Sequence, residues 1–137
     1  MQKFTYDTVY IVDDNNTANL VHEHLLKRIC VAPQIKSFTN PLRALKKLNL
    51  ELLADEKQIL VLLDIHMPEM NGFEFLNAFS LFSVNNELVD VVMVSSSIDE
   101  KEIQQGLEYP IVRKIITKPL KETQLLDFIK QKGIISA

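Results

Sequence analysis

Five short runs rich in β-branched and apolar residues alternate along this chain with five longer stretches of helical periodicity. The runs are TVYIV (8–12), PQIKSF (33–38), QILVLL (58–63), DVVMVS (90–95) and PIVRKII (110–116). The helical stretches are residues 16–29, 41–54, 72–82, 98–107 and 120–132. This alternation predicts βαβ crossovers, and therefore an α/β fold in which a parallel sheet carries helices on both faces. The nearly continuous apolar runs at 59–63 and 91–94 are typical of central strands buried on both sides.

The length of 137 residues suits one ordinary domain with a substantial core. Hydrophobic residues make up 47% of the chain, which also has three Gly and five Pro, as in a compact globular protein. No internal repeat, low-complexity segment or linker interrupts the pattern. We therefore expect a single domain over residues 1–137, without an output domain after the last predicted helix.

The charge and hydropathy of the chain argue against two classes of partner. A formal net charge of −3 is unlike the basic surface of a nucleic-acid binder, and the pairs Lys27-Arg28 and Lys46-Lys47 suit solvated helix faces. No apolar run approaches the roughly 20 residues of a membrane helix, and the N-terminus lacks the apolar core of a signal peptide. We expect a cytoplasmic protein that binds neither nucleic acid nor a membrane.

Isolated cysteine and histidine residues do not form a recognisable site. Cys30 is the only cysteine, so it makes no disulfide within the chain and no metal pattern, and we expect it to fill space in the core or at the surface. His22 and His24 are two residues apart on the first predicted helix, which places them on different faces. We expect both to be exposed to solvent.

Polar residues stand at the end of four of the five predicted strands. Asp13 and Asp14 follow the first strand, Asp64 ends the third, Ser95 ends the fourth and Lys118 follows the fifth. Ligands of open parallel sheets bind at the carboxyl ends of the strands, so these side chains should meet at one edge. Alone, each has an ordinary explanation, such as a helix cap or a strand exit before proline. Together they predict a functional site.

The electrostatics of this edge indicate its chemistry. Two carboxylates about 5 Å apart repel each other by roughly 3 kcal/mol at an effective dielectric constant near 20, so three of them require a proton or a cation. Mg²⁺ suits such ligands, because it accepts few protein groups together with a phosphate oxygen. A metal ion and Lys118 would neutralise a phosphoryl group, and the hydroxyl of Ser95 would donate to it. Asp64 is then best interpreted as a nucleophile that becomes an aspartyl phosphate.

Four motifs resemble the receiver domain of two-component response regulators over nearly the whole chain. They are VDDN (12–15), LLDIHMPEMNGFEFL (62–76), VMVSSS (92–97) and TKPL (117–120), in the order and approximate spacing of the family. The Asp-x-x-Met-Pro-x-Met-x-Gly form that begins at Asp64 is highly specific. The resemblance implies a flavodoxin-like, doubly wound sheet of five parallel strands in the order 2-1-3-4-5, flanked by five helices.

The resemblance also implies roles for the residues at the sheet edge. Asp64 would be the phosphoacceptor and a Mg²⁺ ligand, Asp14 a direct ligand, and Asp13 a ligand through water. The backbone carbonyl of His66 would complete the protein's share of the metal shell.

Ser95 would be the switch hydroxyl and Lys118 the lysine that contacts the phosphoryl group. A histidine kinase or phosphotransfer protein would donate this group, and phosphorylation would shift an existing two-state equilibrium. We expect a protein that assists its own phosphorylation without being a turnover enzyme. Its downstream partner would bind the face formed by the fourth helix, fifth strand and fifth helix.

Three features depart from the family pattern. Ile115 stands where receivers usually carry Tyr or Phe, so we expect a weaker switch or one transmitted by packing alone; Tyr109 precedes the strand and does not replace the aromatic residue. The segment QQGLEYPIVRKII (104–116) replaces the usual Gly- and Ala-rich approach to the fifth strand. In the family, the residue at the position of His66 tunes how fast water removes the phosphate. The sequence of this chain leaves open whether His66 shields the phosphate or orients a water molecule.

A parallel α/β sheet is also compatible with three other functions. A phosphohydrolase of the haloacid dehalogenase type needs a second Asp two residues after the nucleophile, where this chain has His66. A flavodoxin-like cofactor binder needs a phosphate-binding first loop, whereas DDNN (13–16) presents two negative charges. A degenerate receiver that only docks to partners would not need the intact acceptor site, although Ile115 leaves that alternative open.

Overall fold

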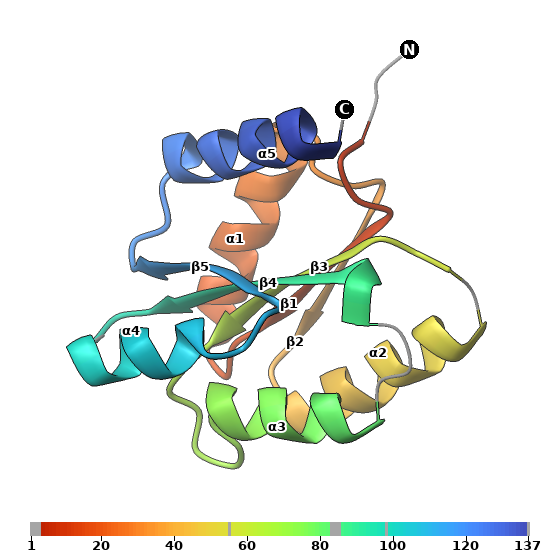
Figure 1. The fold of residues 1–137 in the computed structure, drawn as a ribbon. Coiled ribbons are helices and arrows are strands. Elements are labelled where there is room, and N and C mark those ends of the chain that lie inside the picture. The colour runs from red at the N-terminus through yellow and green to blue at the C-terminus, as the bar shows by residue number, and fades with distance from the viewer. Residues whose placement is uncertain (1–3, 55, 83–85, 98, 137) are drawn as a thin grey trace.

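The computed structural model describes residues 4–54, 56–82, 86–97 and 99–136 (Figure 1). Strands and helices alternate along the chain as predicted. The strands are β1 (Thr8–Val12), β2 (Gln34–Phe38), β3 (Ile59–Asp64), β4 (Val89–Ser95) and β5 (Val112–Thr117). The helices are α1 (Asn16–Arg28), α2 (Pro41–Ala54), α3 (Gly72–Phe82), α4 (Glu100–Leu107) and α5 (Glu122–Ser136), with a short 3₁₀ helix, η1 (Asn86–Leu88), before β4.

The five strands form one parallel sheet in the order β2-β1-β3-β4-β5, which confirms the predicted fold and strand order. Helices α1 and α5 cover one face of the sheet, and α2, α3 and α4 cover the other (Figure 1). Strands β3 and β4 are buried along their whole length, as the continuous apolar runs predicted.

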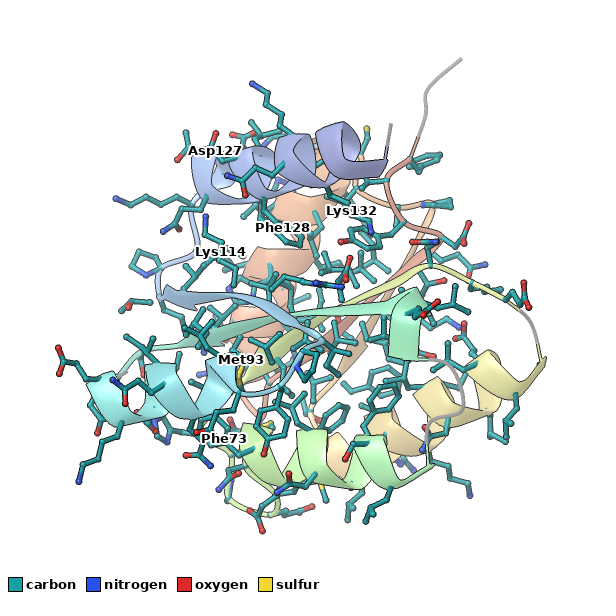
Figure 2. All side chains as sticks on the ribbon, viewed as in Figure 1. Phe73, Met93, Lys114, Asp127, Phe128 and Lys132 are labelled. Carbon is teal, nitrogen blue, oxygen red and sulfur yellow. The ribbon has the colours of Figure 1, made fainter. Side chains whose placement is uncertain are left out.

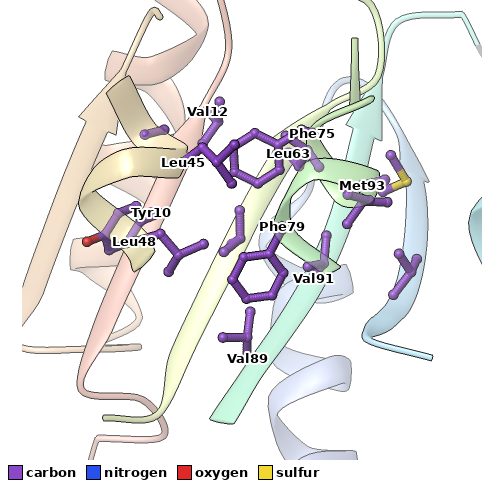
Figure 3. Close-up of a cluster of buried hydrophobic side chains, with 14 of the residues drawn as sticks. Tyr10, Val12, Leu45, Leu48, Leu63, Phe75, Phe79, Val89, Val91 and Met93 are labelled. Atoms are coloured by element: carbon purple, nitrogen blue, oxygen red, sulfur yellow. The ribbon is translucent and has the colours of Figure 1, made fainter. Parts of the chain in front are cut away.

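Two hydrophobic clusters fill the space between the sheet and its helices. The first lies against α2 and α3, where Leu45 and Phe75 meet Leu63 of β3 (Figure 3). The second lies against α1 and α5, where Leu26 and Leu125 pack on the opposite face of the strands. Because both faces of the sheet are covered, its carboxyl edge is held as a rigid platform for the loops that carry polar residues.

Several predicted boundaries shift. Helix α1 ends at Arg28, one residue early, and η1 was not predicted. Helix α5 covers Glu122–Ser136 and not residues 120–132, because Leu120 is buried in the second cluster before the helix begins. Helix α4 is described from Glu100, after a capping box between Asp99 and Glu102; the predicted start at residue 98 lies outside the described residues.

The prediction that His22 is exposed is wrong, whereas His24 is exposed as predicted. The buried positions of α1 are Asn19, His22, Leu25 and Leu26, which form one stripe facing the sheet. Burial, and then the nearby charge of Lys118, lower the pKa of His22, which favours the neutral ring.

The predicted basic pairs on α1 and α2 are exposed, which agrees with solvated helix faces. Cys30 is partly buried two residues after the end of α1, with a backbone φ of 53°. Among the residues that the structure describes, no helix is both long enough and apolar enough to cross a bilayer.

Candidate functional site

The fold brings together the three acidic residues predicted at the sheet edge. Carboxylate oxygens of Asp13, Asp14 and Asp64 all lie within 4.8 Å of one another. Strands β1 and β3 are neighbours, and Val12 pairs with Leu63, so Asp13 and Asp64 occupy matching positions after this pair. Asp13 and Asp64 are 2% and 6% exposed, whereas Asp14 is exposed to solvent. Two of the three negative charges are therefore largely removed from water.

The start of α1 fixes the loop that carries the acidic pair. The side-chain amide of Asn19 donates to the backbone carbonyls of Asp13 (2.9 Å) and Phe38 (3.3 Å). The backbone N–H of Asn15 donates to Asp13 Oδ1 at 2.9 Å, and the side chain of Asn15 caps the helix by accepting from Ala18. Sequence reasoning missed Asn19, although an amide on the apolar stripe of a helix is itself a signal of a buried polar contact.

Lys118 reaches into the acidic cluster from the end of β5. Its Nζ atom lies 2.6 Å from Asp13 Oδ2 and 3.9 Å from Asp64 Oδ1. The backbone N–H of Lys118 donates to the carbonyl of Ser95 at 2.8 Å, which holds this residue beside the end of β4, and the Lys118-Pro119 peptide is cis. The lysine thus sits between the two buried carboxylates, and its shorter contact is with Asp13.

The surroundings of Asp64 favour the protonated carboxyl group. Burial, and then the negative charge of Asp13, raise the pKa of Asp64 to about 6, although Lys118 and the backbone amide of His66 oppose the rise. One lysine therefore offsets only part of the repulsion among three acids. A divalent cation with oxygen ligands would remove the remainder, so the donor set fits a hard metal ion such as Mg²⁺.

This repulsion leads to a stability prediction for Asp64→Asn in the presence of a chelator. The folded protein keeps the Asp64 proton up to about pH 6, whereas the ordinary pKa is 3.8, so wild type loses stability as the pH rises through this interval. Asparagine has no charge to lose. Urea unfolding should show the variant more stable than wild type by about 1 to 3 kcal/mol at pH 8, and by almost nothing at pH 4.

The exposed Asp127 provides the matched control, because Asp127→Asn changes the net charge equally without relieving a buried group. If the difference in free energy of unfolding between Asp64→Asn and wild type were the same at pH 4 and pH 8, the assigned repulsion would be contradicted.

Ser95 and His66 both point toward the start of α4. Ser95 is fully buried, and its Oγ lies 3.3 Å from the carbonyl of Ser97. His66 Nε2 lies 2.9 Å from the same carbonyl and 3.1 Å from Glu102 Oε2. Because the carbonyl and the carboxylate are both acceptors, Nε2 carries the proton and donates. The imidazole therefore links the loop after Asp64 to α4.

Ile115 packs directly against α4 from the middle of β5. A Cβ atom placed on Gly106 would lie 2.6 Å from Ile115 Cδ1, so the side chain fills the space beside this glycine. Tyr109 lies before β5, as expected, and its hydroxyl donates to Asn77 of α3 at 2.6 Å. Its ring also stacks on Phe73, which is labelled in Figure 2. Packing between Ile115 and Gly106 is thus one of the contacts between β5 and α4.

Comparison with known proteins agrees with this architecture. The transcriptional regulatory protein MalR of Bacillus subtilis is 29% identical over 132 residues, which cover 93% of this chain and 52% of MalR. A two-component response regulator from Cytophaga hutchinsonii superimposes with a TM-score of 0.82 at 26% identity, covering 93% of this chain and 96% of that structure. The receiver domain of the histidine kinase CKI1 from Arabidopsis thaliana, solved with Mg²⁺, shares the fold (TM-score 0.77, 20% identity, 91% and 90% coverage).

The chain spans about half the length of MalR, so the comparison with that relative concerns one part of a longer protein. Residues 9–130 match the response regulator receiver domain family, and this range covers the sheet except for Thr8, and most of α5. The chain therefore belongs to the family of response regulator receiver domains.

Proposed function

We propose that this protein accepts a phosphoryl group on Asp64 from a histidine kinase or phosphotransfer protein in a Mg²⁺-dependent reaction, and that it signals by binding another protein. The observation that carries the proposal is the position of Asp64. It is a buried carboxyl group at the end of a central strand, beside two other acids and a lysine.

The acidic cluster has the chemistry of a Mg²⁺ site. Asp14 and Asp64 would hold the ion directly, Asp13 would hold it through water, and the backbone carbonyl of His66 would add a fourth oxygen. The raised pKa of Asp64 supports this assignment, because a cation would relieve the repulsion that causes it. When bound, Mg²⁺ would neutralise negative charge on the phosphoryl oxygens.

The residues of the chain supply the remaining chemistry. A carboxylate oxygen of Asp64 attacks phosphorus while the bond from phosphorus to the donor's histidine nitrogen breaks, and the electron pair of that bond stays on the imidazole. Lys118 exchanges part of its contact with Asp13 for a phosphoryl oxygen, which moves its positive charge onto the new group. Ser95 turns its hydroxyl from Ser97 toward another phosphoryl oxygen. The chain is modified in this reaction and does not turn over a substrate.

The same contacts offer a route from the acceptor to the surface. Reorientation of Ser95 changes the end of β4, and β4 pairs with β5, where Ile115 packs against Gly106 of α4. Since an aliphatic side chain replaces the usual aromatic residue, the signal passes by packing to the face formed by α4, β5 and α5. A partner that recognises this face in one state would read the phosphorylation.

Lys118→Ala is expected to allow phosphorylation and to weaken the response. The variant removes the charge that would hold the phosphoryl group, while Asp64 and the metal ligands remain. Intact mass should still show an adduct after treatment with acetyl phosphate and Mg²⁺. The change in the NMR chemical shift of the Gly106 amide on phosphorylation should fall to less than about half of its wild-type size. Lys121→Ala, at an exposed position, is the control. A full-sized shift at Gly106 in Lys118→Ala would contradict the role of the lysine.

The competing functions give different results in simple assays. A docking module would bind Mg²⁺ but form no adduct with acetyl phosphate. A phosphohydrolase would turn over a generic phosphate ester rapidly, and a flavodoxin-like binder would be purified with the colour of a flavin. A single phosphoryl adduct that forms with Mg²⁺ and fails to form in chelator supports the receiver.

A further inference from the structure

A second cluster of charged residues lies at the amino ends of β4 and β5, at the opposite edge of the sheet from Asp64. Its centre is Asp90, which is only 6% exposed. The carboxylate of Asp90 accepts from the hydroxyl of Tyr6 at 2.7 Å, from Arg113 Nε at 2.9 Å and from Lys132 Nζ at 2.9 Å. Burial opposes ionisation, but these hydrogen bonds, that of Lys132 above all, lower the pKa of Asp90. The cluster therefore contains an ionised carboxylate that anchors two cations.

A β-bulge brings a third basic residue, Lys114, to the same side of the sheet. Val91 pairs with Val112, but Val92 pairs with Lys114, so Arg113 is an extra residue in β5. Side chains of a regular strand alternate between faces, and a bulge breaks the alternation. Val112 packs in the cluster under α3, whereas Arg113 and Lys114 both point to the side covered by α5. The bulge thus directs two consecutive basic residues into one space.

That space is a pocket of about 240 Å³ between β5 and α5. Figure 2 labels three of its lining residues, Lys114 of β5 and Phe128 and Lys132 of α5. The lining consists of Asp90, Arg113, Lys114, Phe128, Gln131 and Lys132. Three basic residues and one acidic residue line the pocket, on a chain whose net charge is −3. The pocket is a local basic site on an acidic protein.

The size and the donors of the pocket limit what it can bind. Pockets for whole small-molecule ligands usually measure about 300 to 1,000 Å³, so this one suits a single side chain or a small anionic group better than a nucleotide. Arg113 directs Nε to Asp90, and 53% of its side chain is exposed, which leaves the terminal guanidinium to face an incoming carboxylate. Lys114 is partly buried beside it, and Phe128 supplies an apolar floor for a methylene stem.

We propose that this pocket binds an acidic side chain, Asp or Glu, of a partner protein. The incoming carboxylate pairs with Arg113 and Lys114, the two basic residues that β5 contributes to the lining. Because the pocket lies away from Asp64, this binding does not require phosphorylation and is measured on the unmodified protein. Its failure would therefore leave the proposed phosphorylation untouched.

The test follows backbone amide shifts by NMR during titration with a blocked Gly-Glu-Leu-Glu-Gly peptide at constant ionic strength. A neutral Gly-Gln-Leu-Gln-Gly peptide and inorganic phosphate are titrated in parallel. We expect a saturable shift, with a Kd on the order of 1 mM, centred on Arg113, Lys114 and Gln131 for the acidic peptide only. Lys114→Ala should weaken binding roughly fivefold, and Lys114→Glu should abolish it.

Lys130→Ala is the matched control, since Lys130 lies exposed on the same helix as Lys132 and its loss changes the net charge equally. If Lys130→Ala and Lys114→Ala weakened binding of the acidic peptide equally, overall charge would explain the effect, and the proposed binding in the pocket would be overturned. A lack of saturable shifts would also overturn it. Phosphate that binds the pocket more tightly than the acidic peptide would assign it to a phosphoryl group and refute an acidic side chain as the occupant.

Discussion

Asp64→Asn is expected to lose phosphorylation completely, while the protein stays folded. An amide has no anionic oxygen to attack phosphorus, so the variant keeps the shape of the site without its nucleophile. The other acids cannot substitute: Asp13 is already paired with Lys118 at 2.6 Å, and Asp14 is exposed to water. Intact mass after incubation with acetyl phosphate and Mg²⁺ should show one added phosphoryl group on wild type and none on the variant.

Asp127→Asn should take up the phosphoryl group like wild type, because Asp127 lies exposed on α5. If Asp64→Asn still gained a phosphoryl group at a similar rate, another residue would be the acceptor, and the proposed chemistry of the sheet edge would fail.

Gly72→Ala is expected to damage both the stability and the site. A Cβ atom on Gly72 would lie 2.8 Å from the backbone oxygen of Asp64, 2.8 Å from Met93 Cε and 3.1 Å from Ile65 Cα. The methionine can move, but the backbone of β3 cannot move without displacing Asp64. Urea unfolding should show a loss of about 3 kcal/mol or more, at the upper end of the cost of overpacking, and phosphorylation should slow.

Gly106→Ala tests whether the close approach, and not the loss of glycine itself, causes this damage. Its Cβ atom would meet only the flexible end of Ile115 at 2.6 Å and Met93 Sδ at 3.4 Å. Alanine also gains about 1 kcal/mol of helix propensity within α4. We therefore expect Gly106→Ala to lie within about 1 kcal/mol of wild type. A Gly72→Ala variant as stable as Gly106→Ala would show that the loop after Asp64 is not tightly held.

The fold and the acidic edge could be predicted because each rests on a strong local pattern. Residues of a central strand buried on both faces are mostly apolar, so β3 and β4 were visible as nearly continuous runs, and parallel strands bring their carboxyl ends together. The meeting of Asp13, Asp14 and Asp64 follows from these two facts. The closer contact of Lys118 with Asp13 than with Asp64 does not follow from them, because it depends on the path of one long side chain.

Other features lay beyond sequence patterns or were overlooked. His22 was expected to be exposed, yet its position on the helix shares the stripe of Leu25 and Leu26. Asp90 interrupts the apolar fourth strand, and an acid in a buried strand always requires compensation. The electrostatic argument applied to Asp64 would also have indicated that Asp90 needs a compensating charge. The bulge at Arg113 has no comparable signal, since VRKII (112–116) has no glycine or proline to mark the break in alternation.

The most direct test of the central claim is to locate the phosphoryl group. Wild-type protein is phosphorylated with acetyl phosphate and Mg²⁺, reduced with borohydride, which converts an aspartyl phosphate to homoserine, and digested for peptide mass analysis. We predict homoserine at position 64 alone, and none when a chelator replaces Mg²⁺. Homoserine at Asp13 or Asp14, or an equal yield in chelator, would contradict the proposed acceptor and its metal-dependent chemistry.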